Sequence, residues 1–63
     1  MLSNKRLRAL RHLAGKSQEI LAFEANVSQA KLSRVERGIY EFSKEEKERV
    51  AQVLGCKAEE IFI

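Results

Sequence analysis

Two short amphipathic segments follow one another between residues 17 and 38 with only three residues, 25–27, separating them, and this spacing is the strongest constraint on the fold. Leu21 lies on the inward face of the first segment when its residues are placed at the period of an α-helix. Leu32 and Val35 take the same position in the second segment. Because three residues leave room only for a sharp turn, we predict two helices that pack against each other across that turn.

Residues suited to helix ends stand at the expected boundaries of both segments. The hydroxyl of Ser17 or Ser28 can accept a hydrogen bond from a free backbone N–H of the helix that follows. Asn26 lies just after the first helix, where a left-handed backbone is needed and asparagine tolerates it. Gly38 provides the same conformation after the second helix. The small side chain of Ala22 suits the place where the two helices approach most closely.

The second segment carries a polar and cationic face opposite its inward residues. This face consists of Gln29, Ala30, Ser33, Arg34 and Arg37. A face of this kind is often only a solvated helix surface. Beside a sharp turn it is also typical of a helix that reads DNA, because glutamine can pair with adenine and arginine with guanine. Small residues allow close approach to a thymine methyl group or to a phosphate.

The same stretch resembles the helix-turn-helix of the phage repressor and Cro family, also called the XRE or Cro/C1-type family. The resemblance rests on apolar, small and polar positions that agree together, namely Gln18, Leu21, Ala22, Asn26, Val27, Ser28, Leu32, Ser33, Glu36 and Gly38. It covers nearly the whole chain, through Leu7, Leu10 and Arg11 in a first helix and Val50, Ala51, Leu54 and Gly55 in a fourth. The resemblance implies an all-α, compact five-helix repressor-like domain over residues 1–63, in which helices 2 and 3 form the helix-turn-helix that binds operator DNA.

Local signals predict the remaining helices. The first is expected over about residues 4–14, with an inward face made of Leu7, Leu10 and Ala14. Ser43 and Glu46 have the spacing of a capping box and mark the start of the fourth helix. The last stretch, residues 57–63, suits a fifth helix that closes part of the core.

Size and composition exclude several classes of protein. A chain of 63 residues buries too little surface for a deep catalytic cleft beside its core, so we do not expect an enzyme. Cys56 is the only cysteine and His12 the only histidine, which excludes a disulfide framework and a closed zinc site within one chain. No apolar run approaches the roughly 18 residues of a membrane span, and the basic start lacks the continuous apolar core expected of a signal peptide. We therefore expect a cytoplasmic protein that needs neither cofactor nor metal.

The positive charge lies at one end of the sequence. Residues 1–16 carry five basic and no acidic side chains, residues 17–37 are balanced, and residues 38–63 hold four bases against six acids. In a DNA-binding protein the basic end would face the phosphates and the acidic end would point away. An RNA or a membrane surface could attract the same basic region.

The helical face and the resemblance together assign contacts to individual residues. We expect base edges to be contacted by Gln29, Ala30, Ser33 and Arg34. We expect phosphates to be contacted by Arg11, Gln18, Ser28, Lys31 and Arg37. In the resembling family the chain end commonly forms the dimer contact, which here implies Ile61, Phe62 and Ile63, although at least one of these side chains is expected in the core. The protein would then repress transcription by occupying a palindromic operator as a dimer.

Two structural roles are also implied by the resemblance. Arg11 would pair with Glu36 and so join the first helix to the recognition helix, unless both side chains are ordinary exposed residues. Gln18 would either bind a phosphate at the start of its helix or brace the side chain of Gln29.

Several residues depart from the family pattern. Lys16 and Lys47 stand where relatives place apolar residues, and Phe42 replaces a common proline and is expected to fill the edge of the core. Ile20 and Phe23 are apolar where relatives carry charge, and we interpret them as a local repacking that compensates for the two lysines. They could instead form a surface for a protein partner. That alternative makes the chain a protein-interaction module, or an antitoxin-like protein that binds both a partner and DNA.

Overall fold

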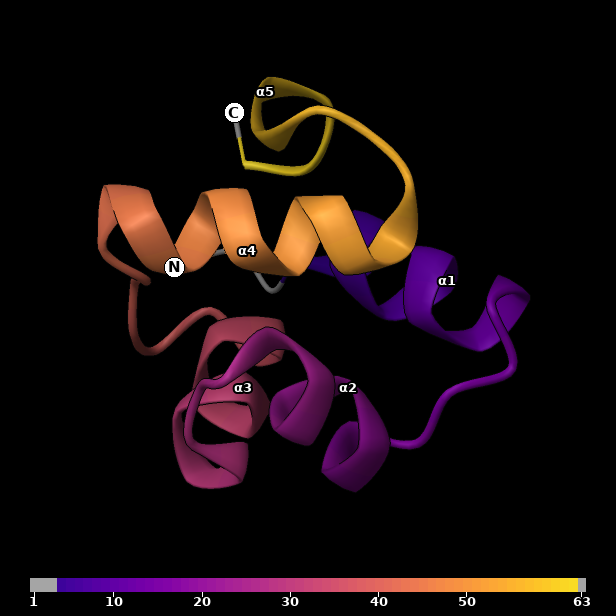
Figure 1. Ribbon diagram of the computed structural model, residues 1–63. Coiled ribbons are helices and arrows are strands. Elements are labelled where there is room, and N and C mark those ends of the chain that lie inside the picture. Colours follow the sequence, from indigo (N-terminus) through magenta and orange to yellow (C-terminus); the bar gives the residue numbers. More distant parts are fainter. Residues whose placement is uncertain (1–3, 63) are drawn as a thin grey trace.

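The computed structural model describes residues 4–62, which fold into five helices without a strand. The helices are α1 (Lys5–Leu13), α2 (Gln18–Ala25), α3 (Gln29–Glu36), α4 (Lys44–Leu54) and α5 (Ala58–Ile61). Figure 1 shows α4 across the middle of the molecule, with α5 on one side and the α2–α3 pair on the other. The predicted all-α, five-helix architecture is confirmed. None of the helices within residues 4–62 is long and apolar enough to cross a membrane.

The predicted helix ends are present. Ser17 accepts a hydrogen bond from the backbone of Ile20 at 3.1 Å, and Ser28 accepts one from the backbone of Lys31 at 3.2 Å. Asn26 adopts the left-handed conformation at a φ of 56°, which closes α2 and turns the chain into α3. Ser43 and Glu46 form the reciprocal capping box that starts α4.

One hydrophobic core joins the helices. Its fully buried side chains come from different helices, so each element contributes to the same interior. The buried apolar residues are Leu7, Leu21, Ala22, Ala25, Leu32, Val35, Phe42, Val50, Ala51 and Ile61. Leu10 is only partly buried and Ala14, which follows the last residue of α1, is exposed, so the inward face of α1 is shorter than predicted. The expected filling of the core edge by Phe42 is confirmed, since only 4% of this residue is exposed.

The two lysines at unusual positions form ion pairs. Lys16 forms an ion pair with Glu24 at 2.7 Å. Lys47 pairs with Glu41 at 3.3 Å, and its amino group lies 5.8 Å from the centre of the Phe62 ring. Both lysines are partly buried, and both amino groups reach acidic partners.

Ile20 and Phe23 do not compensate for these lysines, and the repacking interpretation is wrong. The structure leaves 48% of Ile20 and 85% of Phe23 exposed. The inward face of α2 is already filled by Leu21, Ala22 and Ala25, whose spacing places residues 20 and 23 on another side of the helix.

The C-terminal helix contributes to the core more than the dimer prediction implied. Ile61 is 3% exposed and belongs to the hydrophobic core, so its side chain is not available at the surface. Phe62 is partly buried and packs edge-on against Phe42, with ring centres 6.0 Å apart. Ile63 lies outside the described residues.

Candidate nucleic-acid interface

The outer face of α3 presents the side chains predicted to read bases. Gln29, Ala30 and Arg34 are exposed, and Ser33 is partly exposed between them. The opposite face is anchored, because Leu32 is fully buried and Val35 is 4% exposed. The buried face fixes the rotation of the helix about its axis and leaves the polar face open to solvent.

A buried carboxylate lies under the end of α3. Glu36 is fully buried and accepts two hydrogen bonds from Arg11, from Nε to Oε2 at 2.7 Å and from Nη2 to Oε1 at 3.1 Å. Gln18 Nε2 donates to the same Oε1 at 3.0 Å, and the Nε atom of Arg8 lies 3.7 Å from it. The backbone N–H of Asn4 also donates to the carbonyl of Glu36 at 2.9 Å. One residue of α3 is thus bound by α1, by α2 and by the residue that caps α1.

The surroundings of Glu36 keep it ionised. Burial alone favours the neutral acid, but the hydrogen bonds from Arg11 and Gln18 and the positive charges of Arg11 and Arg8 outweigh it. Together they hold the pKa of Glu36 below its ordinary value. A carboxylate with this pKa accepts hydrogen bonds at neutral pH and never donates one, which fixes the direction of every bond in the cluster.

A sequence model of a protein family, described as a helix-turn-helix domain, matches residues 5–61 of the chain. The chain belongs to this helix-turn-helix family. Both the family and the fold are those of DNA-binding regulators of the XRE type, not of enzymes. A comparison with curated proteins gives no match.

Three solved structures have the same helix-turn-helix fold. The restriction-modification controller protein C.AhdI from Aeromonas hydrophila is 36% identical over 94% of this chain and 89% of its own, with a TM-score of 0.87. A complex of the SinR and SinI proteins contains a chain that is 27% identical over 97% of this chain and 60% of its own, with a TM-score of 0.89. The clp gene regulator ClgR from Corynebacterium glutamicum is 34% identical over 87% of this chain and 58% of its own, with a TM-score of 0.80.

Within this helix-turn-helix domain, two residues assigned to phosphates bind internally. The side chain of Arg11 is 9% exposed, and its remaining guanidinium nitrogen, Nη1, donates to the carbonyl of Lys16 at 3.0 Å. Arg11 is therefore a structural residue. It does not reach the surface, contrary to the expectation that it contacts a phosphate. Gln18 is partly buried and directs its amide nitrogen to Glu36 and not to Gln29, so the expected brace between the two glutamines is absent from the described residues.

Lys31 also has partners within the helix-turn-helix domain. Its amino group donates to Glu46 of α4 at 3.0 Å and lies 5.5 Å from the centre of the Tyr40 ring. The hydrogen bonds to Glu46 and Tyr40 raise the pKa of Lys31 above its ordinary value. This side chain turns from the outer face of α3 toward α4, and we no longer assign it to a phosphate.

Arg8 is a candidate that the sequence reasoning overlooked. Its side chain is 48% exposed and lies against the buried Glu36 cluster, so it extends toward solvent beside α3. Its position one helical turn before Arg11 was a usable signal, because residues three apart share a helix face. The assignments of Ser28 and Arg37 are compatible with their exposure, and they stay predictions.

Proposed function

We propose that the chain binds double-stranded DNA at a specific sequence and regulates transcription, most simply as a repressor that occupies its operator as a dimer. The observation that carries this proposal is the pairing of an open polar face on α3 with a buried cluster beneath it. Gln29, Ala30, Ser33 and Arg34 occupy the open face, while Glu36 is held from three sides. In this proposal residues 1–63 act as one DNA-binding domain in the cytoplasm.

The base contacts follow from the chemistry of the open face. The N-terminal residues of a recognition helix contact base edges in the major groove, which places Gln29 and Ala30 deepest. The Gln29 amide can pair with adenine, and the Arg34 guanidinium with guanine. Ala30 and Ser33 are short enough to let the helix approach the floor of the groove.

The phosphate contacts come from residues at the edges of α3 and from α1. The Ser28 hydroxyl accepts a hydrogen bond from Lys31 N–H, which leaves its own hydrogen free to donate to a phosphate. Arg37 is exposed at the end of α3, where its Nε lies 3.4 Å from the carbonyl of Ser33. Arg8, which is half exposed and lies 3.7 Å from Glu36 at the end of α3, supplies a third donor in place of Arg11.

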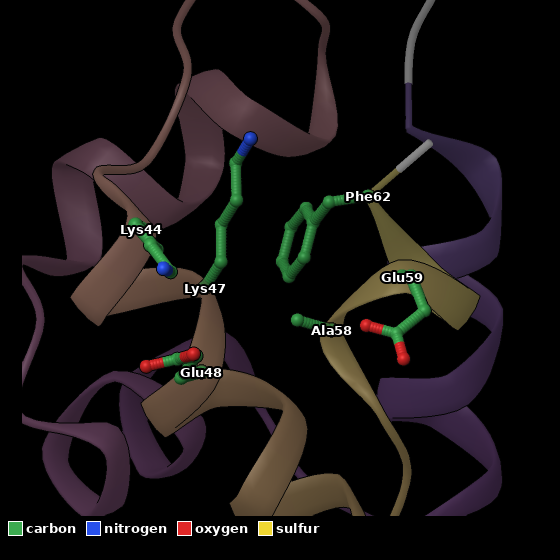
Figure 2. A pocket seen from close by; sticks show the side chains of 6 residues that line it. All are labelled: Lys44, Lys47, Glu48, Ala58, Glu59 and Phe62. Carbon is green, nitrogen blue, oxygen red and sulfur yellow. The ribbon is translucent and has the colours of Figure 1, made fainter.

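A second copy would associate through α4 and α5. Figure 2 shows an open hollow between these helices, lined by Lys44, Lys47, Glu48, Ala58, Glu59 and Phe62. Charges of both signs beside an aromatic ring suit contact with the same surface of another molecule. Across a two-fold axis, a basic group of one copy can pair with an acidic group of the other, and the symmetry repeats that pair. Two recognition helices about 34 Å apart would then meet successive major grooves.

Binding to a pool of random duplex DNA at near-physiological salt tests the proposal. Sequencing of the retained molecules should give an enriched palindrome with half-sites about one helical turn apart. Retention that depends on salt but enriches no sequence would contradict specific recognition. Sedimentation of the complex should give two protein chains per duplex, and one chain per duplex would contradict the dimer.

The exposed apolar side of α2 favours a second candidate function. Ile20 and Phe23 stand together in solvent on the described surface, a feature that marks protein-interaction sites when a patch is large enough. An antitoxin-like protein would use this side for a partner and α3 for DNA. Loss of partner binding in Phe23→Ser, with DNA binding unchanged, would support this second candidate.

A further inference from the structure

A side chain of α4 binds the turn of the helix-turn-helix directly. Arg49 Nε donates to the carbonyl of Ala25 at 2.9 Å, and its Nη2 donates to the carbonyl of Asn26 at 3.2 Å. These carbonyls lie at the end of α2, where no further helical turn supplies donors. The positive guanidinium also lies at the negative end of the α2 dipole. Arg49, a residue of α4, therefore supplies hydrogen-bond donors to the carbonyl groups of the turn.

The same face of α4 binds the first turn of α3. Glu46 precedes Arg49 by three residues, so the two side chains lie on one side of the helix. Glu46 Oε2 accepts from Lys31 Nζ at 3.0 Å, and its Oε1 accepts from the backbone of Ser43 at 2.8 Å. Because both carboxylate oxygens are bound, the position of the Glu46 side chain is defined.

We propose that Glu46 and Arg49, here named the turn clamp, set the angle at which α3 is presented to DNA. Arg49 is then a positioning residue for sequence discrimination. The inference rests on the proposed function, because it assumes that α3 reads bases. It names a residue of α4 that touches no DNA in that function.

The two ends of α3 are held by different contacts, and this arrangement supports the positioning role of Arg49. The Glu36 cluster fixes the C-terminal end of α3 to α1 and α2. The turn clamp fixes the N-terminal end, where Gln29 and Ala30 begin the helix. Since the N-terminal residues of a recognition helix contact base edges, a small tilt at this end displaces the reading groups most. Phosphate contacts tolerate such a tilt better than paired hydrogen bonds to a base.

The experiment compares three variants in the full chain. Arg49→Met removes the donors and keeps much of the aliphatic stem, and Arg49→Lys keeps the charge but cannot donate to two carbonyls from a fork. Val53→Ala is the matched control, because Val53 is a partly buried residue of α4 that packs on the core without binding the turn. Affinity is measured for the best sequence selected from a random duplex pool and for a shuffled duplex of equal length. Urea unfolding gives the stability of each variant.

The ratio of the two affinities is the readout. Arg49→Met should lower it about tenfold, comparable to the loss of one base-pair contact. Arg49→Lys should lower it less and should leave the affinity for the shuffled duplex within about twofold, since its charge is kept. Val53→Ala should lose stability with the ratio unchanged. If Arg49→Met and Arg49→Lys keep the wild-type ratio, or if Val53→Ala lowers it equally, the positioning role is wrong.

A measurement without DNA separates this inference from the proposed function. The Val27 N–H donates to the carbonyl of Ala22 at 2.9 Å across the turn, and its hydrogen exchange reports opening of the turn. Arg49→Met should accelerate this exchange at least about tenfold more than Val53→Ala of similar stability. A wild-type chain that discriminates no sequence overturns the proposed function. Unchanged exchange at Val27 overturns the clamp itself.

Discussion

Arg11 and Glu36 form a two-pronged ion pair inside the protein, with side chains that are 9% and 1% exposed. The guanidinium joins α1 to the last residue of α3 through hydrogen bonds of 2.7 and 3.1 Å. A buried charge that loses its partner is costly, because water cannot reach it to replace the lost bonds. This is the Arg11–Glu36 pair that the family resemblance implied, so that prediction is confirmed. The pair makes Arg11 a determinant of stability, whereas the phosphate contact that was also expected of Arg11 does not fit its burial.

Arg11→Ala should lower the free energy of unfolding by about 3 kcal/mol, since Glu36 is left buried with fewer donors. Arg8→Ala is the matched control, because Arg8 meets the same carboxylate from a half-exposed position at 3.7 Å. The control should lose less than about 1 kcal/mol. Urea denaturation of both variants gives the two values. Equal losses of stability in the two variants would show that the Arg11–Glu36 pair contributes no more than the contact between Arg8 and Glu36.

Stability should fall as the pH drops toward the acid range. The pKa of Glu36 lies below its ordinary value of 4.5 in the folded protein, so the charged form is favoured by folding. Its contribution is fully present above about pH 4.5 and is lost as the pH falls through the lower folded pKa. Denaturation midpoints measured between neutral and acid pH should show this decline. Glu36→Gln should be less stable at neutral pH and should show a shallower decline, while Glu46 keeps part of the dependence because its pKa is also lowered.

Arg34→Ala should weaken binding to the best selected sequence by roughly 1 to 3 kcal/mol and relax the preference at one base pair. The reason is that a guanidinium paired with a guanine edge discriminates between bases. Competition binding with single-base variants of the selected site measures both effects. An equal loss on shuffled DNA would show that Arg34 contacts the backbone instead.

Arg37→Ala should weaken binding to all sequences alike. Its side chain is exposed at the end of α3, where a phosphate contact adds affinity without sequence information. The slope of log affinity against log salt should become shallower by about one. A changed sequence preference with an unchanged slope would contradict this assignment.

Substitution of two phenylalanines should change stability by very different amounts. Phe42→Ala removes a ring that is 4% exposed and should destabilise the fold by about 3 kcal/mol or more. Phe23→Ser alters a side chain that is 85% exposed and should change stability by no more than about 0.5 kcal/mol. Thermal or urea unfolding distinguishes them. A large loss in Phe23→Ser would mean that this ring packs against the protein in solution.

Local signals in the sequence were sufficient for most of the fold. The caps at Ser17, Ser28 and Ser43 and the left-handed Asn26 depend on backbone chemistry within a few residues, and they are present where predicted. The buried faces of α2 and α3 follow from helical spacing alone. These features need no knowledge of which elements meet in space.

Contacts between distant segments were beyond such reasoning. Lys31 donates to Glu46, and Arg49 donates to the carbonyls of Ala25 and Asn26. Both contacts exist only because α4 packs against the turn between α2 and α3. The spacing of residues along one helix cannot show which flanking charge will be taken by another helix. Phe23 was misjudged because an apolar side chain was assumed to be buried in the core. The inward face of α2 is formed by Leu21, Ala22 and Ala25, and Phe23 lies on another side of the helix.

The carboxylate of Glu36 also has a consequence for how the protein opens. It is bound by side chains of α1 and α2, and the backbone of the same residue is bound by Asn4. Detachment of α1, of α2 or of the segment at Asn4 removes hydrogen bonds from Glu36 and so weakens the contacts that Glu36 makes with the other two. Residues 4–36 should therefore exchange their slowest amide hydrogens together, as a single cooperative unit, with no partly opened form in which α1 alone detaches.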